Sequence, residues 1–221
     1  MTLLRQFLRN IYTCRACSSE CGFAQSSNGA YYKFPPIIGA NTQADLLFVG
    51  INPRRSSTNL DLHTALMSSK KAFAELAANR WNGKPYIHAK GEPHYRFHLR
   101  VVEGVYDTDL PFETFAAATE LFFCASTKSN QLPYPGSACA DQFLPITLNL
   151  IQPKVILAVG SRVLRFFNGK KDAITLSQLS GREYPIVWMP HPADPELSET
   201  VKEILLQKTI LTVRKHLGKG G

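Results

Sequence analysis

The sequence predicts an α/β fold: a three-layer α/β/α arrangement around a central, mainly parallel sheet of four strands. Short apolar runs alternate along the chain with segments whose apolar residues recur at helical spacing. Strands that alternate with helices are joined by right-handed crossovers, which give parallel sheets covered on both faces. The chain has 221 residues, 44% of them hydrophobic, which suits one such domain, so we expect residues 1–221 to form a single unit.

The first half of the chain supplies two of the expected strands. Apolar residues at helical spacing over 3–11 predict a short amphipathic helix, which belongs to an N-terminal part, residues 1–22, packed on the sheet. Residues 45–49 (DLLFV) have the pattern of a buried parallel strand. Further along we expect a helix over 64–78, an irregular polar segment over 79–111 and the second strand over about 120–125 (ELFFCA).

The second half supplies the other two strands. The run at 154–159 (KVILAV) predicts the third strand, a helix follows over 162–167, and the run at 185–189 (PIVWM) predicts the fourth strand. A last helix is expected from Pro195 to His216. The residues expected on its apolar side are Leu197, Val201, Ile204, Leu205, Ile210, Leu211 and Val213.

Residues that follow the strands mark the expected ligand site. In an open parallel sheet, ligands bind beyond the carboxyl ends of the strands. The positions to search are Asn52 after the first strand, the segment from Ser126 to Asn130 after the second, Gly160 after the third and His191 after the fourth. We therefore expect Asn52 and His191 to lie at the mouth of one pocket.

The turn after the first strand reads Gly50-Ile51-Asn52-Pro53-Arg54. Glycine and proline shape a tight turn, and Asn52 offers both a donor and an acceptor to a ligand or a water. The alternative interpretation is an ordinary Asn-Pro turn without a ligand.

The loop after the fourth strand holds His191 between two prolines, Pro190 and Pro192. Proline restricts the backbone on both sides of the ring, and a fixed imidazole is suited to donate to a developing negative charge. The alternative is a loop histidine whose ring is satisfied by a nearby carbonyl.

Four cysteines form two pairs. Cys14 and Cys17 are closely spaced, and Cys124 and Cys139 come much later. Two such pairs can bring four thiolates around a 4Fe–4S cluster or a tetrahedral zinc ion. The alternative for Cys124, inside an apolar run, is a small buried side chain. Cys21 is a spare that could substitute as a ligand.

The charge balance favours a polyanionic partner. Lys and Arg number 25 against 17 Asp and Glu, which gives a net charge of +8, and such a surplus suits nucleic acid better than a membrane. Arg54, Arg55 and Lys128 are the candidates for phosphate contacts. A basic protein without a polyanionic partner is the alternative.

The sequence also lacks the marks of export. It has no apolar run long enough to span a bilayer, and its first residues lack the unbroken apolar centre of a signal peptide. Clustered cysteines without a secretion signal favour a reducing compartment. We therefore expect a cytoplasmic protein, acting as a monomer and without a membrane partner.

The order of these motifs resembles the uracil-DNA glycosylase superfamily. The matching segments are Cys14-x-x-Cys17, VGINP at 49–53, Cys124, Cys139, PKVILAVG at 153–160 and MPHPA at 189–193. The cysteines look like those of the iron–sulfur branch often called family four. The resemblance covers roughly residues 10–195, and it implies the α/β fold, a 4Fe–4S cluster held by the four cysteines, and removal of a base from DNA.

The resemblance also implies roles for individual residues. Asn52 matches the residue that positions the attacking water, and His191 matches the histidine that donates to the uracil carbonyl as charge builds on the departing base. The loop that enters the duplex corresponds to about Ala193 to Ser198 and includes Asp194. The residues implied around the base are Gly50, Ile51, Pro53, Glu120 and Ser126.

Two positions depart from the iron–sulfur branch. The first motif is GINPR where the branch has Gly-Glu-Ala-Pro-Gly, so that it looks more like the mismatch-specific glycosylases, and Arg54 replaces a glycine. Glu120 or Thr119 stands where the branch has the Asn that reads the uracil edge. A carboxylate faces a carbonyl poorly unless a proton intervenes. Two alternatives to a glycosylase therefore stay open: a catalytically silent nucleic-acid-binding protein of the same fold, and a zinc-stabilised α/β protein that acts on a small nucleotide ligand.

Overall fold

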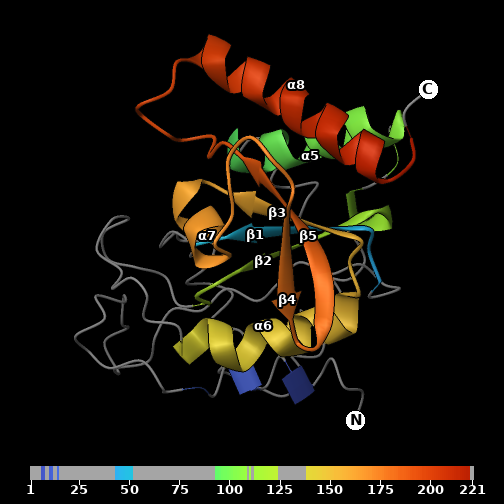
Figure 1. Ribbon diagram of the computed structural model, residues 1–221, viewed down its shortest axis with the longest axis vertical. Coiled ribbons are helices and arrows are strands. Elements are labelled where there is room, and N and C mark those ends of the chain that lie inside the picture. Colours follow the sequence, from blue (N-terminus) through green and yellow to red (C-terminus); the bar gives the residue numbers. More distant parts are fainter. Residues whose placement is uncertain are drawn as a thin grey trace, which may run out of the picture.

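The expected fold class is confirmed by a computed structural model of the chain (Figure 1). The protein has a five-stranded, mostly parallel sheet with helices on both faces. The structure describes residues 6, 7, 10, 11, 14, 43–51, 93–108, 110, 112–123 and 138–219. The strands are β1 (Leu46–Gly50), β2 (Ala116–Glu120), β3 (Val155–Val159), β4 (Thr175–Leu179) and β5 (Arg182–Met189). The helices are α5 (Pro93–Tyr106), the short 3-10 helix η3 (Phe112–Thr114), α6 (Ala138–Ile151), α7 (Ser161–Phe166) and α8 (Glu199–His216).

The sheet has the strand order β2-β1-β3-β5-β4. The pairs β1–β2, β1–β3 and β3–β5 are parallel, and β4 pairs antiparallel with β5. The described residues thus contain five strands, one more than the four expected. Strand β4 alternates partly buried and exposed residues and returns into β5 through a two-residue turn at Ser180 and Gly181, both with positive φ. Such an alternating polar strand carries no apolar run to reveal it.

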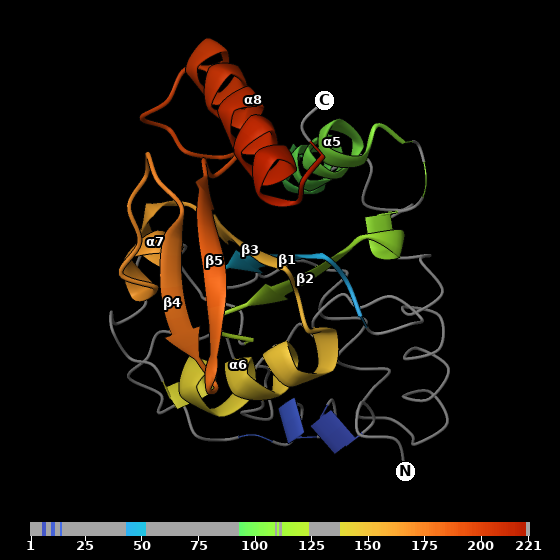
Figure 2. The same cartoon turned by 45° about the vertical axis from the view of Figure 1, so that its right-hand side comes forward.

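The helices cover the two faces of the sheet in separate layers (Figures 1 and 2). Helices α5 and α8 lie on one face, where Val101 and Leu206 pack against Phe48 and Leu157 in one hydrophobic cluster. Helices α6 and α7 belong to the other face, together with Phe7 from the N-terminal helical residues. Side chains that alternate along each buried strand supply both clusters, as expected for a sheet covered on both sides.

The second strand and the segment before it differ from the expectation. Strand β2 covers Ala116–Glu120 rather than 120–125. Its alanines are weak strand formers, but they are buried between helix layers, and that packing fixes the strand. The segment 79–111, expected to be irregular, contains helix α5. Pro93 is the first residue of this helix, where proline is tolerated, so that it marks a helix start rather than a loop.

The last helix is shorter than expected and buries only part of the expected apolar side, including Ile210 and Val213. It begins at Glu199, not at Pro195, because Ser198 caps it by accepting a hydrogen bond from the Val201 backbone N–H at 3.3 Å. Its buried residues include Leu206, Ile210 and Val213. Three residues expected on the apolar side are instead exposed, namely Val201, Ile204 and Leu211.

Candidate functional site

The carboxyl ends of four parallel strands form one edge of the sheet. The register pairs Gly50 of β1 with Glu120 of β2, and Val159 of β3 with Met189 of β5. Since β1 and β3 are neighbours, these strand ends form one row. This is the edge at which open parallel sheets bind ligands.

Backbone hydrogen bonds extend the pairing beyond the strand ends. The Phe122 N–H donates to the Ile51 carbonyl at 3.0 Å, and the Gly160 N–H donates to the Met189 carbonyl at 2.9 Å. Ile51, which is partly buried, therefore lies beside the chain that leaves β2. Asn52 follows Ile51 directly but lies outside the described residues.

His191 is held against Gly160. A Cβ built on Gly160 would lie 3.3 Å from the His191 Cβ and 3.9 Å from its Cγ and Cδ2. Gly160 also has a φ of 86°, a left-handed conformation that other residues adopt only with strain. The glycine at the end of β3 thus lets the histidine ring lie over the neighbouring strand end.

The ring of His191 is held by the turn that follows it. The Ala193 backbone N–H donates to the His191 Nδ1 at 3.1 Å. A nitrogen that accepts this bond carries no proton, so the contact favours the tautomer with its proton on Nε2.

The residues after His191 form a compact turn. The Asp194 N–H donates to the His191 carbonyl at 3.0 Å, and the Glu196 N–H donates to the Asp194 Oδ1 at 3.0 Å. Ala193 is exposed and Asp194 is half-buried. The segment expected to contact DNA thus begins in the same turn that holds the imidazole.

Glu120 is the last residue of β2, so its carboxyl belongs to the same edge. A Cβ on residue 50 would lie 2.8 Å from the Glu120 Cδ, which means that the carboxyl fills the space beside Gly50. The residue as a whole is partly exposed, but its Oε2 is enclosed and has no hydrogen-bond partner among the described residues. Burial raises the pKa of this carboxyl to about 8.

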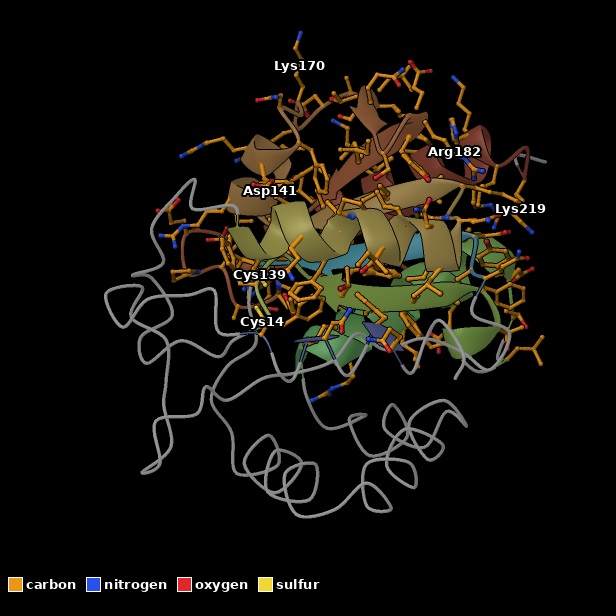
Figure 3. The ribbon with its side chains drawn as sticks, turned by 90° about the horizontal axis from the view of Figure 1, so that it is seen from below. Cys14, Cys139, Asp141, Lys170, Arg182 and Lys219 are labelled. Atoms are coloured by element: carbon orange, nitrogen blue, oxygen red, sulfur yellow. The ribbon has the colours of Figure 1, made fainter. Side chains whose placement is uncertain are left out.

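Two of the predicted cluster cysteines converge at the start of α6. The Cys14 Sγ lies 3.7 Å from the Oε1 of Gln142, one helical turn after Cys139. Figure 3 shows both cysteines at this end of the helix. The Phe123 backbone N–H donates to the Cys139 Sγ at 3.5 Å, so Cys139 also lies beside the residue that precedes Cys124. Amide hydrogen bonds to sulfur are a feature of iron–sulfur sites, so these residues fit the expected cluster.

Several predicted site residues lie outside the described part of the chain. They are Asn52, Pro53, Arg54, Arg55, Ser126, Lys128, Cys17 and Cys124. Their roles stay predictions, as does the pocket shared by Asn52 and His191. Within the described ranges no three metal-binding side chains gather, and two of the four expected cysteine ligands are not among those residues.

Two features of the site were not expected from the sequence. Gly160 was recognised as the residue after a strand, but not as the support for His191. The signal was present, since a glycine directly after a buried strand often marks a close approach. Gln142 beside Cys14 had no such signal, because its role depends on the packing of the N-terminal residues on α6.

A scan against protein-family models and a search of curated proteins both find no match to this chain. Of the helices in the described residues, none combines the length and the apolar character that a membrane span requires.

Proposed function

We propose that this protein is a DNA glycosylase that hydrolyses the N-glycosidic bond of uracil or of a related damaged or mismatched base. One observation carries the proposal: at the ligand edge of the sheet, the Ala193 backbone N–H donates to the His191 Nδ1 at 3.1 Å, which favours Nε2 as the nitrogen that can donate to a ligand. A neutral imidazole with a fixed N–H is a donor for charge that develops on a departing base. The resemblance of the surrounding motifs to the uracil-DNA glycosylases agrees with this chemistry.

The reaction needs the base outside the stack. Flipping the nucleotide into the pocket at the strand ends costs a few kcal/mol of unstacking. The bond between the sugar C1′ and the base nitrogen then breaks, and its electron pair leaves with the base. The His191 Nε2–H donates a hydrogen bond to the base carbonyl as this charge grows. The oxygen of a water oriented by Asn52 bonds to C1′, and solvent accepts the proton that the water loses and supplies the one that the base gains.

The four cysteines Cys14, Cys17, Cys124 and Cys139 would hold a 4Fe–4S cluster, with zinc as the alternative. When bound, this group supplies thiolate coordination that joins the N-terminal residues to α6 and to the chain after β2. Support comes from Cys14 and Cys139 at one end of α6. The purified protein should contain iron and absorb near 400 nm, and Cys139→Ala should lose both while Cys21→Ala keeps them. If the purified wild type contained zinc and no iron, the cysteines would hold zinc instead of a 4Fe–4S cluster.

DNA, single- or double-stranded, is the proposed partner of a cytoplasmic monomer. The net charge of +8 supports it, and Arg54, Arg55, Lys128 and the turn at Ala193 and Asp194 are the proposed contacts. Affinity for undamaged duplex should fall with salt, with a log–log slope of about −0.9 for each phosphate neutralised. If the affinity did not change with salt, the net charge of +8 would no longer support DNA as the partner.

The direct test is base release by the wild type. Single- and double-stranded oligonucleotides that contain uracil are compared with the same sequences without it. We expect release of free uracil and an abasic product only from the former. Asn52→Ala should slow release by about a hundredfold, the scale of losing one preorganised group, whereas Asn149→Ala, an exposed position on α6, should not. Failure to release any base from a panel of modified oligonucleotides would reject the proposal.

A second function is favoured by one observation. Glu120 is an acid where an amide is expected, and a chain that has lost base chemistry could tolerate this change. A catalytically silent nucleic-acid-binding protein would bind the same oligonucleotides with the same salt dependence and release nothing. Binding and release measured on one sample therefore separate the two functions.

A further inference from the structure

Four exposed basic residues follow the ligand edge within one short segment. They lie between residues 162 and 171, a stretch without aspartate or glutamate, and are Arg162, Arg165, Lys170 and Lys171. The segment starts two residues after Gly160, beside which His191 lies. Asp172, the residue that follows the segment, forms an ion pair with Lys208 of α8 at 2.8 Å, so a further lysine offsets its charge. Cations gathered beside a ligand edge create a positive potential that attracts a polyanion.

Helix α7 directs two of these residues away from the core. Its buried residues are Val163 and Leu164, and the helix packs on β3 and β5. Arg162 and Arg165 are exposed and three positions apart, so they lie on the same outer side of the helix, with about 5–6 Å between their Cβ atoms. Two cations at this spacing can contact neighbouring phosphates of one strand.

The chain after α7 places the third and fourth cations next to the first two. The Gly169 N–H donates to the Leu164 carbonyl at 2.9 Å, which closes the end of the helix. The Lys171 Nζ lies 5.1 Å from the centroid of the ring of Trp188, the last residue but one of β5. Lys171 is therefore held near the carboxyl end of the strand that leads to the histidine. The Lys170 side chain points outward from the molecule (Figure 3).

The other side of the ligand edge carries the opposite charge. Residues 195–201, which lead into α8 and form its first turn, contain Glu196 and Glu199 and no lysine or arginine. Helices α7 and α8 cover opposite faces of the sheet (Figures 1 and 2). Phosphates are therefore attracted to the α7 side of the edge and repelled from the α8 side.

We propose that the basic strip formed by Arg162, Arg165, Lys170 and Lys171 binds the sugar–phosphate backbone of the strand that carries the target base. The proposal rests on the proposed function, because it names how the same edge holds its DNA. Phosphate contacts fix the position of a nucleic acid without reading its sequence. The strip thus holds the nucleotides beside the target base, while His191 faces the base itself. These contacts add to those expected of Arg54, Arg55 and Lys128.

The test compares three double variants that lose the same charge. Arg162→Gln/Arg165→Gln and Lys170→Gln/Lys171→Gln each remove two cations from the strip. The control, Arg182→Gln/Lys215→Gln, removes two exposed cations at the amino end of β5 and in the last turn of α8. The affinity of each protein for an undamaged oligonucleotide is measured over a range of salt concentrations.

Each strip variant should bind DNA more weakly and lose about 1 unit of the log–log salt slope for each residue replaced, whereas the control should keep the wild-type slope. In single-turnover release of uracil, the strip variants should need more enzyme to reach half of the maximal rate. The maximal rate itself should not change, because the strip contacts neither the base nor C1′. The lysine variant covers the case in which Arg165 also supports the fold of α7.

Two binding results would overturn the proposal. If both strip variants kept the wild-type affinity and slope, the strip would not contact phosphates. If the control lost as much as the strip variants, DNA would respond to the total charge and not to this surface. Binding to vesicles of anionic lipid that fell in the strip variants, with DNA binding unchanged, would assign the strip to a membrane instead.

Binding and release separate this proposal from the glycosylase function. A wild type that releases no base from any oligonucleotide, with strip variants that still lose affinity and slope, would lose the proposed function and keep the DNA contact. A wild type that releases uracil, with strip variants that bind DNA as the wild type does, would keep the function and reject the strip.

Discussion

The polar side chains at the two ends of the ligand edge, His191 and Glu120, are held in different ways. His191 lies beside Gly160, directly after β3, and Glu120 lies beside Gly50, the last residue of β1. The histidine is held from within the protein, because the Ala193 N–H donates to its Nδ1, which favours the proton on Nε2. The carboxyl of Glu120 has an enclosed oxygen with no such internal partner among the described residues. One side chain is thus held by its own turn, and the other has a buried oxygen for which the described residues supply no hydrogen bond.

The largest stability effect is expected at Glu120. The pKa of this carboxyl rises from an ordinary 4.5 to about 8 in the folded protein. Between these values the unfolded chain releases the proton and the folded chain keeps it, so that a rise in pH favours unfolding and stability is lost toward pH 8. From about pH 5 to pH 7.5 the wild type should lose on the order of 3 kcal/mol more than Glu120→Gln, at 1.36 kcal/mol per pKa unit.

Urea unfolding of the two proteins at several pH values measures this difference. Glu183→Gln, which changes an exposed carboxylate on β5, should follow the wild type. If the free energy of unfolding changed with pH in the same way for the wild type and Glu120→Gln, the pKa of the carboxyl would not be raised by folding. Glu120 would then be ionised in the folded protein at neutral pH.

A smaller effect is expected at the glycine beneath His191. In Gly160→Ala, the added Cβ strains a backbone with φ of 86° and comes within 3.3 Å of the His191 Cβ. The cost should be about 1–2 kcal/mol, the scale of an alanine in the left-handed region. Base release should fall more than stability predicts, because the ring is displaced. A variant with wild-type release and wild-type stability would show that the glycine does not position the histidine.

The smallest effect is expected where the turn after His191 enters α8. Ser198→Ala removes the helix cap that accepts from the Val201 N–H, at a cost of about 1 kcal/mol. Release of uracil from oligonucleotides should change little, because the hydrogen bond between the Ala193 N–H and the His191 Nδ1 is formed within the turn itself. A large loss of release at full stability would show that the helix cap, and not the local turn, fixes the imidazole.

The sequence predicted the His191 side of the edge better than the Glu120 side. Strands β1, β3 and β5 are apolar runs that end in a glycine or lead to the His-Pro motif, so that their carboxyl ends could be located. The same reasoning put Glu120 at the beginning of a strand, at the wrong edge of the sheet. It is the last residue of an alanine-rich strand, whose position depends on burial between two helix layers and not on strand propensity.

The chemistry at the two ends was predictable to a similar degree. A histidine between prolines indicated a fixed ring, but its tautomer depends on a backbone turn that spacing does not define. A carboxylate was expected to suit uracil only with an intervening proton, and the burial that supplies a reason for that proton comes from the fold. Asn52, the third residue expected at the edge, stays a prediction because it lies outside the described residues.

The central claim is that the neutral imidazole of His191 donates from Nε2 to a departing base. It is tested by single-turnover release of uracil from a single-stranded oligonucleotide by the wild type and His191→Ala, with His216→Ala at the exposed end of α8 as the control. The account predicts a loss of about a hundredfold or more in His191→Ala, unchanged binding of undamaged DNA, and a wild-type rate in His216→Ala. A folded His191→Ala protein that releases uracil at the wild-type rate would contradict it.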